Sequence, residues 1–183
     1  QGRSKFIRNL LNDIQALEIM LEKGLLESDI TRIGSEQEFC LVTKNWRPSK
    51  KSAEILKDID DPHFTTEIAL FNLEINLDPI ELKSDAFSIV ENQLNTLLKK
   101  ASDSAKKFDN NIVLTGILPT ITKRELEFDY MTPLDRYWML NDMLKELRGK
   151  DFRMHMRGVD ELFIKHSSVL FEGCNTSFQL HLQ

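Results

Sequence analysis

The sequence predicts an α+β domain in which a mostly antiparallel sheet carries helices on one face. Two long segments, residues 4–26 and 84–108, repeat apolar side chains every three or four positions, as helices with one buried face do. Residues 72–78 and 177–183 instead alternate strictly between polar and apolar side chains, which is typical of strands with one solvated face. Long helices beside such strands favour a sheet with one covered face and one polar face.

The first helix is predicted to begin near Ser4, a residue type that caps helices, and to end close to Gly24. We therefore divide the chain into an N-terminal amphipathic helical segment, residues 1–30, and a main domain, residues 31–183. The sequence leaves open whether this helix packs on the domain or on a partner chain, so a homo-oligomer is one of the expectations.

The main domain contains further elements between the two alternating strands and the second helix. Residues 43–62 are polar and predict a loop with one helical turn. The other expected elements are a strand at 33–43, a short buried strand at 111–119, a helix at 133–148 with Pro133 in its first turn and Gly149 past its end, and a strand at 152–158. Residues 159–172 follow no clear pattern.

Composition narrows the class of protein. The chain has 183 residues, of which 41% are hydrophobic and 29% charged, enough for one domain with a core. No apolar run approaches the roughly 20 residues of a membrane helix, and the start lacks a secretory pattern, so no membrane partner is expected. The net charge of −5 argues against nucleic acid as the main partner. Cys40 and Cys174 have no metal-ligand spacing, which predicts reduced thiols in a cytoplasmic protein.

Carboxylates lie within otherwise apolar strand segments. Glu36 and Glu38 are two positions apart, so both side chains point to the same face of the predicted strand. Unpaired anions on one face of a half-buried sheet repel each other and resist desolvation. A bound metal ion would relieve both effects, although a fully solvated strand face would also tolerate the pair.

A second pair of acids follows. Thr65 and Glu67 are polar at odd positions, whereas Glu74 belongs to a run with polar residues at even positions. A bulge or sharp bend near Leu70–Phe71 reconciles the two phases and brings Glu67 and Glu74 to one face. The last strand adds Gln179 and His181 on its polar face. Four carboxylates and an imidazole suit Mg²⁺ or Mn²⁺, which can clamp nucleotide phosphates.

Five stretches in this order, IGSEQEF, TTEIALFNLEINLDP, TGILP, MTPLDRY and NTSFQLHL, resemble the glutamate–cysteine ligase family and its carboxylate–amine ligase relatives. Proteins of that family share a glutamine-synthetase-like catalytic sheet. The resemblance runs from about residue 31 to 183. It implies an ATP-dependent reaction in which the γ-carboxylate of glutamate becomes an acyl phosphate and is then attacked by an amine such as that of cysteine.

The resemblance also assigns roles to individual residues. Glu36 and Glu38 match the family's Glu-x-Glu pair, and Glu67 and Glu74 match a second pair of metal-binding acids. His181 matches a histidine that completes a metal site. The substrate-binding residues expected from the resemblance and from the polar face of the last strand are Arg136, Tyr137 and Gln179; an arginine suits a bidentate grip on a carboxylate or phosphate.

The chain departs from the family in length. Its ligases are considerably longer, and their second half supplies further metal ligands and the basic residues that hold ATP. We therefore expect residues 31–183 to be the N-terminal part of a catalytic domain truncated at its C-terminus and inactive alone. Two alternatives stay open: the same fold acting on a different amine, and a non-catalytic domain that binds a metal or another ligand.

Overall fold

The computed structural model describes residues 2–149, 152–166 and 168–183. Its α-helices are α1 (Gly2–Glu22), α2 (Ser52–Ile59), α3 (Ala86–Lys107) and α4 (Asp135–Arg148), and its short 3₁₀ helices are η1 (Lys123–Leu126), η2 (Phe128–Tyr130) and η3 (Val169–Cys174). The strands are β1 (Arg32–Thr43), β2 (Phe64–Thr66), β3 (Asn72–Asn76), β4 (Ile80–Glu81), β5 (Asn110–Val113), β6 (Phe152–Arg157), β7 (Glu161–His166) and β8 (Phe178–Leu182).

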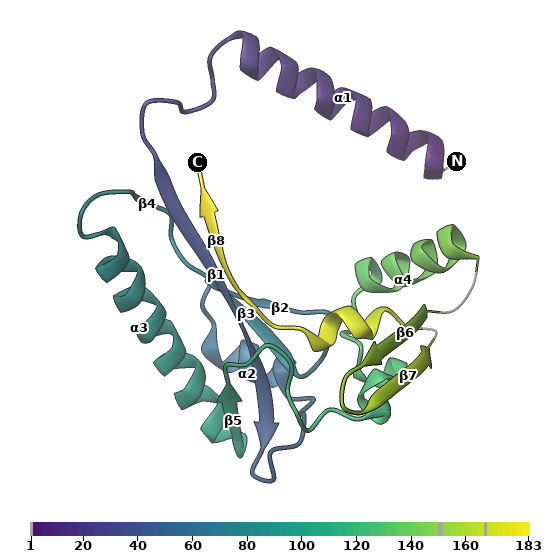
Figure 1. The fold of residues 1–183 in the computed structure, drawn as a ribbon. Coiled ribbons are helices and arrows are strands. Elements are labelled where there is room, and N and C mark those ends of the chain that lie inside the picture. Colours follow the sequence, from purple (N-terminus) through teal and green to yellow (C-terminus); the bar gives the residue numbers. More distant parts are fainter. Residues whose placement is uncertain (1, 150–151, 167) are drawn as a thin grey trace.

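The long strand β1 organises the main sheet (Figure 1). It pairs antiparallel with β3, β4, β5 and β8, while β2 pairs antiparallel with β3. Both β3 and β8 pair with Glu36 and Gln37 of β1, so these two strands flank β1 on opposite sides. Strands β6 and β7 form a separate antiparallel hairpin. The predicted α+β class with an antiparallel sheet is confirmed.

Helices α2 and α3 cover one face of the sheet. Alternate residues of β1 and β3 project into this layer, where Phe39, Leu41, Leu73 and Ile75 are fully buried. Val90, Leu97 and Ala101 of α3 and Ile55 and Ile59 of α2 complete this core. The intervening residues of the same strands, among them Glu36, Glu38 and Glu74, therefore lie on the opposite face, which these two helices leave uncovered.

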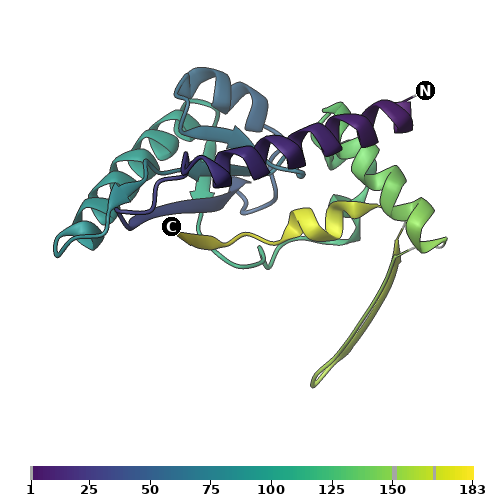
Figure 2. The same cartoon turned by 90° about the horizontal axis from the view of Figure 1, so that it is seen from above.

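A second core lies at the far end of the molecule and supports the loops beside the sheet. It packs η3 and the first turn of α4 around Phe71, Tyr130, Tyr137 and Leu170. Seen from above, α4 and the β6–β7 hairpin extend away from the sheet (Figure 2). None of the described helices combines enough length with enough apolar character to cross a lipid bilayer.

The structure confirms, with shifted ends, the expected helices at 4–26, 84–108 and 133–148 and the expected strands at 33–43, 72–78, 152–158 and 177–183. Residue 1 of the predicted N-terminal segment lies outside the described residues. Two expectations were wrong. The segment 43–62 contains the eight-residue helix α2 where one helical turn was expected, and only residues 111–113 of the apolar run 111–119 belong to a strand, β5. The unsettled stretch 159–172 contains β7 and most of η3.

The expected change of direction near Leu70–Phe71 is present, but it is the turn of a hairpin and not a bulge. Strand β2 ends at Thr66, the chain turns, and β3 begins at Asn72, whose backbone N–H donates to the Ala69 carbonyl at 3.0 Å. The returning strand places Thr65 opposite Glu74. Glu67 therefore lies in the turn, directly after β2.

Candidate metal and substrate site

The site begins with two carboxylates from neighbouring strands. Glu38 of β1 lies directly opposite Glu74 of β3 in the antiparallel register. Side chains at opposed positions of such a pair share a face and lie close enough to interact. Two like charges in this position destabilise the sheet unless another group compensates them.

Glu67 joins this pair from the β2–β3 turn. Carboxylate oxygens of Glu38, Glu67 and Glu74 all lie within 4.8 Å of one another, and all three side chains are half-buried. Glu74 also accepts a hydrogen bond from the Asn76 side-chain amide at 2.7 Å, which fixes its orientation along β3. The β2–β3 turn and the register of β1 and β3 thus bring together oxygen ligands from three places in the backbone: β1, β3 and the turn.

The electrostatics of the cluster disfavour three negative charges. Burial and the carboxylates of Glu74 and Glu38 raise the pKa of Glu67 to about 7. Burial also raises the pKa of Glu38, with hydrogen bonds from Ser177 opposing this and repulsion from Glu74 and Glu36 adding to it. None of the groups that perturb these two carboxyls is a Lys or Arg side chain. The described residues therefore leave the acidic cluster without a neutralising cation, and a divalent metal fits its donor set.

Ser177, immediately before β8, holds Glu38 in place. Its backbone N–H donates to Glu38 Oε2 at 2.8 Å, and its hydroxyl lies 3.4 Å from the same oxygen. Gln179 donates from its side-chain amide to the Ser177 hydroxyl at 3.2 Å. With one oxygen of Glu38 occupied in this way, the other remains available to a ligand in the cluster.

The three residues before β8 are themselves fixed by the loop at 115–117. Thr176 donates from its backbone N–H to the Gly116 carbonyl at 2.8 Å and from its hydroxyl to the Thr115 carbonyl. Ile117 and Asn175 form an isolated β-bridge. The position of Ser177, and through it that of Glu38, therefore depends on the segment that follows β5.

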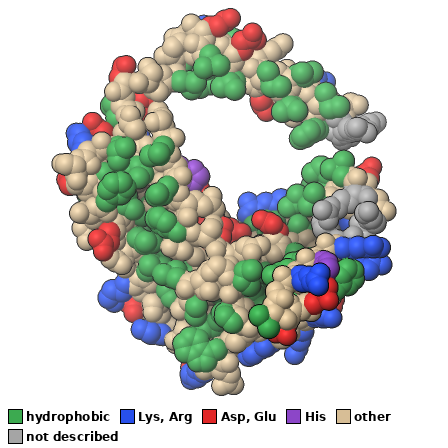
Figure 3. All heavy atoms as spheres, viewed as in Figure 1, with side chains coloured by type: hydrophobic (Ala, Val, Ile, Leu, Met, Phe, Trp, Pro, Cys, Tyr) green, Lys and Arg blue, Asp and Glu red, His purple; other side chains and the backbone are tan. Residues whose placement is uncertain are grey.

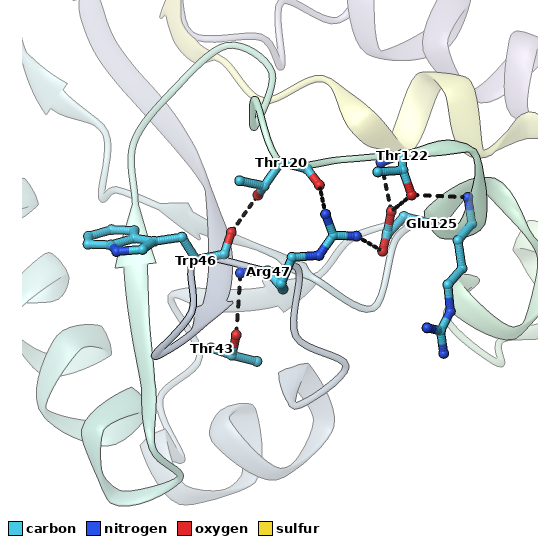
Figure 4. Close-up of polar contacts among 7 residues, drawn as sticks. Thr43, Trp46, Arg47, Thr120, Thr122 and Glu125 are labelled. Atoms are coloured by element: carbon cyan, nitrogen blue, oxygen red, sulfur yellow. Dashed lines mark hydrogen bonds and ion pairs between the residues drawn. The ribbon is translucent and has the colours of Figure 1, made fainter.

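Arg47 anchors that segment further along the chain (Figure 4). Its guanidinium donates to the Thr120 carbonyl at 2.6 Å and to Glu125 Oε1 at 2.7 Å. The other oxygen of Glu125 accepts from the backbone N–H and the hydroxyl of Thr122, both at 2.7 Å. Burial opposes ionisation of Glu125, but the Thr122 hydrogen bonds and Arg47 outweigh it, so the pKa of this carboxyl is lower than usual. Its side chain is only 3% exposed.

A hollow of about 390 Å³ opens over the carboxylates. It is lined by Glu38, Glu67, Ile68, Glu172, Asn175, Ser177 and Gln179. In the space-filling view, acidic side chains gather near the middle of this face, at the edge of the opening beneath α1 (Figure 3). The volume is large enough for a small polar ligand to contact a metal held by the three acids.

Glu36 and His181 form a neighbouring pair on the same face. Gln179 of β8 lies opposite Glu36, and His181 of β8 lies opposite Gly34. The side chains of Gln179 and His181 therefore lie on the same face as Glu36 and Glu38 of β1. The Nε2 atom of His181 is 3.2 Å from Glu36 Oε1. Of the five predicted metal ligands, the structure groups Glu38, Glu67 and Glu74 in one cluster and places Glu36 with His181 beside it.

The predicted substrate residues lie in two places. Gln179 lines the acidic hollow. Arg136 and Tyr137, in the first turn of α4, contact the strand residue before Glu67: Arg136 donates to the Thr66 hydroxyl at 3.3 Å, and the Tyr137 hydroxyl donates to the Thr66 carbonyl at 3.1 Å. Arg136 lines a different hollow, of about 550 Å³, that includes Leu56 and Phe64. Its guanidinium also lies over the Tyr137 ring.

Sequence reasoning missed Glu172, Asn175 and Ser177 as lining residues. Ser177 carried a usable signal, because it lies two positions before Gln179 on the polar face of the last strand. Glu172 and Asn175 lie in and just after η3, in a segment without periodicity, so only the tertiary fold places them at the site.

Comparisons with known proteins give no relative: no family model, no curated protein and no solved structure matches this chain. The class that the fold and the site define is therefore a mixed α+β domain with an antiparallel sheet and an acidic, half-buried cluster on its open face.

Proposed function

We propose that this chain carries the metal-binding and glutamate-binding face of an ATP-dependent carboxylate–amine ligase similar to glutamate–cysteine ligase. The observation that carries the proposal is the convergence of Glu38, Glu67 and Glu74 within 4.8 Å in a hollow on the uncovered face of the sheet. Three carboxylates with no neutralising side chain among the described residues are costly to bring together, and a bound divalent metal would offset that cost.

The proposal divides the work among the residues. Glu38, Glu67 and Glu74 would hold Mg²⁺ or Mn²⁺, and Ser177 would keep Glu38 oriented toward it. A metal in this position supplies neutralisation of the charge that develops when a phosphoryl group moves from ATP to a carboxylate. Gln179 and Asn175 offer side-chain amides to the polar groups of a substrate in the hollow. Glu36 and His181 form an adjacent pair that suits a second metal.

The acceptor amine rests on the resemblance in sequence alone, so a different amine with the same activation chemistry remains the second candidate. Arg136 enters the proposal as a residue that grips a carboxylate only through that resemblance, because its guanidinium contacts Thr66 and Tyr137 and lines the other hollow.

ADP release by the full-length product of the gene tests the proposal. With Mg²⁺, ATP, glutamate and a panel of amines including cysteine, we expect release that requires both glutamate and one amine. Glu74→Gln should lower the rate by about 100-fold, because it removes one metal ligand and one negative charge. Glu91→Gln on the exposed surface of α3 is the matched control and should leave the rate unchanged. Equal rates in the two variants, or no release from folded protein with any amine, would contradict the ligase proposal.

A further inference from the structure

Helix α1 presents an apolar surface that nothing in the described structure covers. Every described side chain from Ser4 to Glu22 is exposed. In the ribbon view α1 stands away from the sheet beyond the connection at 23–31, and hydrophobic side chains follow its length in the space-filling view (Figures 1 and 3). Most of the stability of helices in proteins comes from packing of their apolar face, and an unpacked apolar stripe along α1 is costly to solvate.

The spacing of the stripe is that of a two-stranded coiled coil. Its central residues, Ile7, Leu10, Ile14, Leu17 and Leu21, follow steps of three, four, three and four, the a and d positions of a heptad. Isoleucine at two a positions with leucine at both d positions favours a pair of helices over a larger bundle. Phe6, Leu11 and Met20 flank this seam at g and e positions and widen it.

The charges of α1 are segregated along its length. Residues 2–12 contain Arg3, Lys5 and Arg8 and no acid, whereas residues 13–22 contain Asp13, Glu18 and Glu22 and no base. This order opposes the helix macrodipole, since the first turn has no acidic residue and the last turn has no basic one. An isolated α1 is therefore disfavoured by its own charges as well as by its exposed apolar stripe.

We propose that α1 pairs in antiparallel orientation with α1 of a second copy of this chain. That arrangement places the basic half of each helix beside the acidic half of the other and opposes the two macrodipoles. A two-fold symmetric pair requires a surface complementary to itself, and three basic residues followed by three acidic residues provide this. In a parallel pair, by contrast, Asp13 at g would face Glu18 at e of the second helix, and the like-charged halves would lie together.

The first test is the association of the whole chain by sedimentation equilibrium. We expect a dimer that dissociates on dilution and whose dissociation constant rises by about tenfold or more in the double variant Ile14→Ser/Leu17→Ser, which removes two seam side chains without altering charge. Both side chains are exposed within a single copy, so this variant should retain the fold. Asn12→Ser/Gln15→Ser, at f and b positions outside the seam, makes the same kind of change without altering charge and should leave association unchanged. A monomer at all concentrations, or equal association in the two double variants, would overturn the proposal.

The second test determines orientation. A fluorophore attached at Ser4→Cys would lie about 30 Å along the helix axis from its counterpart in the antiparallel pair, and adjacent to it in a parallel one. Labelling is directed to the helix because Cys40 and Cys174 are buried. We also expect Glu18→Lys/Glu22→Lys to weaken association at low salt and the further change Lys5→Glu/Arg8→Glu to restore it. Labels in direct contact, or association indifferent to these charges, would contradict the antiparallel pair.

Discussion

Replacing Arg47 by Ala is expected to lower the free energy of unfolding by about 2–3 kcal/mol. The change removes both guanidinium hydrogen bonds and leaves the nearly buried carboxylate of Glu125 with only its Thr122 partners. The loss should be smaller than for a fully buried ion pair, because the Arg47 side chain is 44% exposed and remains partly solvated. Urea unfolding of the wild-type and variant chains measures the difference.

Two further variants separate the contribution of geometry from that of charge. Arg47→Lys keeps the charge but cannot reach the Thr120 carbonyl and Glu125 together, so we expect an intermediate loss. Lys44→Ala breaks the exposed pair with Asp109 and should cost no more than about 1 kcal/mol. A loss for Arg47→Ala no greater than for Lys44→Ala would show that the buried carboxylate does not depend on the arginine.

Replacing Glu67 by Gln is expected to stabilise the metal-free chain at pH 8 by about 1–2 kcal/mol, after allowing for partial exposure of the carboxyl. At this pH Glu67 is ionised in the folded and unfolded chains. Burial of the charge and its repulsion by Glu74 and Glu38 destabilise only the folded chain. Glutamine has nearly the same shape and removes the charge. A marked loss of stability would instead identify Glu67 as a structural residue.

The gain should depend on pH in a direction fixed by the raised pKa. The folded-state pKa of Glu67 is about 7, above the ordinary value of 4.5, so the folded chain binds more protons between these values. The wild-type chain therefore loses stability relative to Glu67→Gln as pH rises from about 4.5 to about 7, and the two converge below that window. Urea unfolding at pH 4.5 and pH 8 measures this, with Glu91→Gln as the control. An equal gain at both pH values would contradict the assignment.

The strand periodicity predicted most of the acidic face. The two-residue spacing of Glu36 and Glu38 in β1 and the strict alternation in β3 identified Glu38 and Glu74 as residues of a polar face, because side chains two positions apart in a strand point the same way. The reversal of phase predicted that the chain changes direction before β3 and that Glu67 approaches Glu74. It could not distinguish a bulge from a hairpin turn, because that choice depends on which strand pairs with β3.

Other features depend on contacts distant in sequence. The sequence could not predict that the apolar run after β5 leaves the sheet. Val113 is the last residue of β5 that pairs with β1, where it lies opposite Cys40. Further along this edge of β1, the Glu38 N–H donates to the Ser177 carbonyl and is therefore not available to the run after β5. Helix α2 is only eight residues long, too short for periodicity to distinguish it from a polar loop. Glu172 reaches the site through η3, whose position is set by the second core.

The central claim is that Glu38, Glu67 and Glu74 bind a divalent metal, and a calorimetric titration of the chain with Mn²⁺ tests it most directly. We expect binding that Glu38→Gln and Glu74→Gln each weaken by about tenfold or more, since each removes one of the three converging oxygen ligands. Glu91→Gln should bind as the wild-type chain does. Retained affinity in both site variants, with the fold intact by circular dichroism, would show that the acidic cluster on the open face of the sheet does not bind the metal.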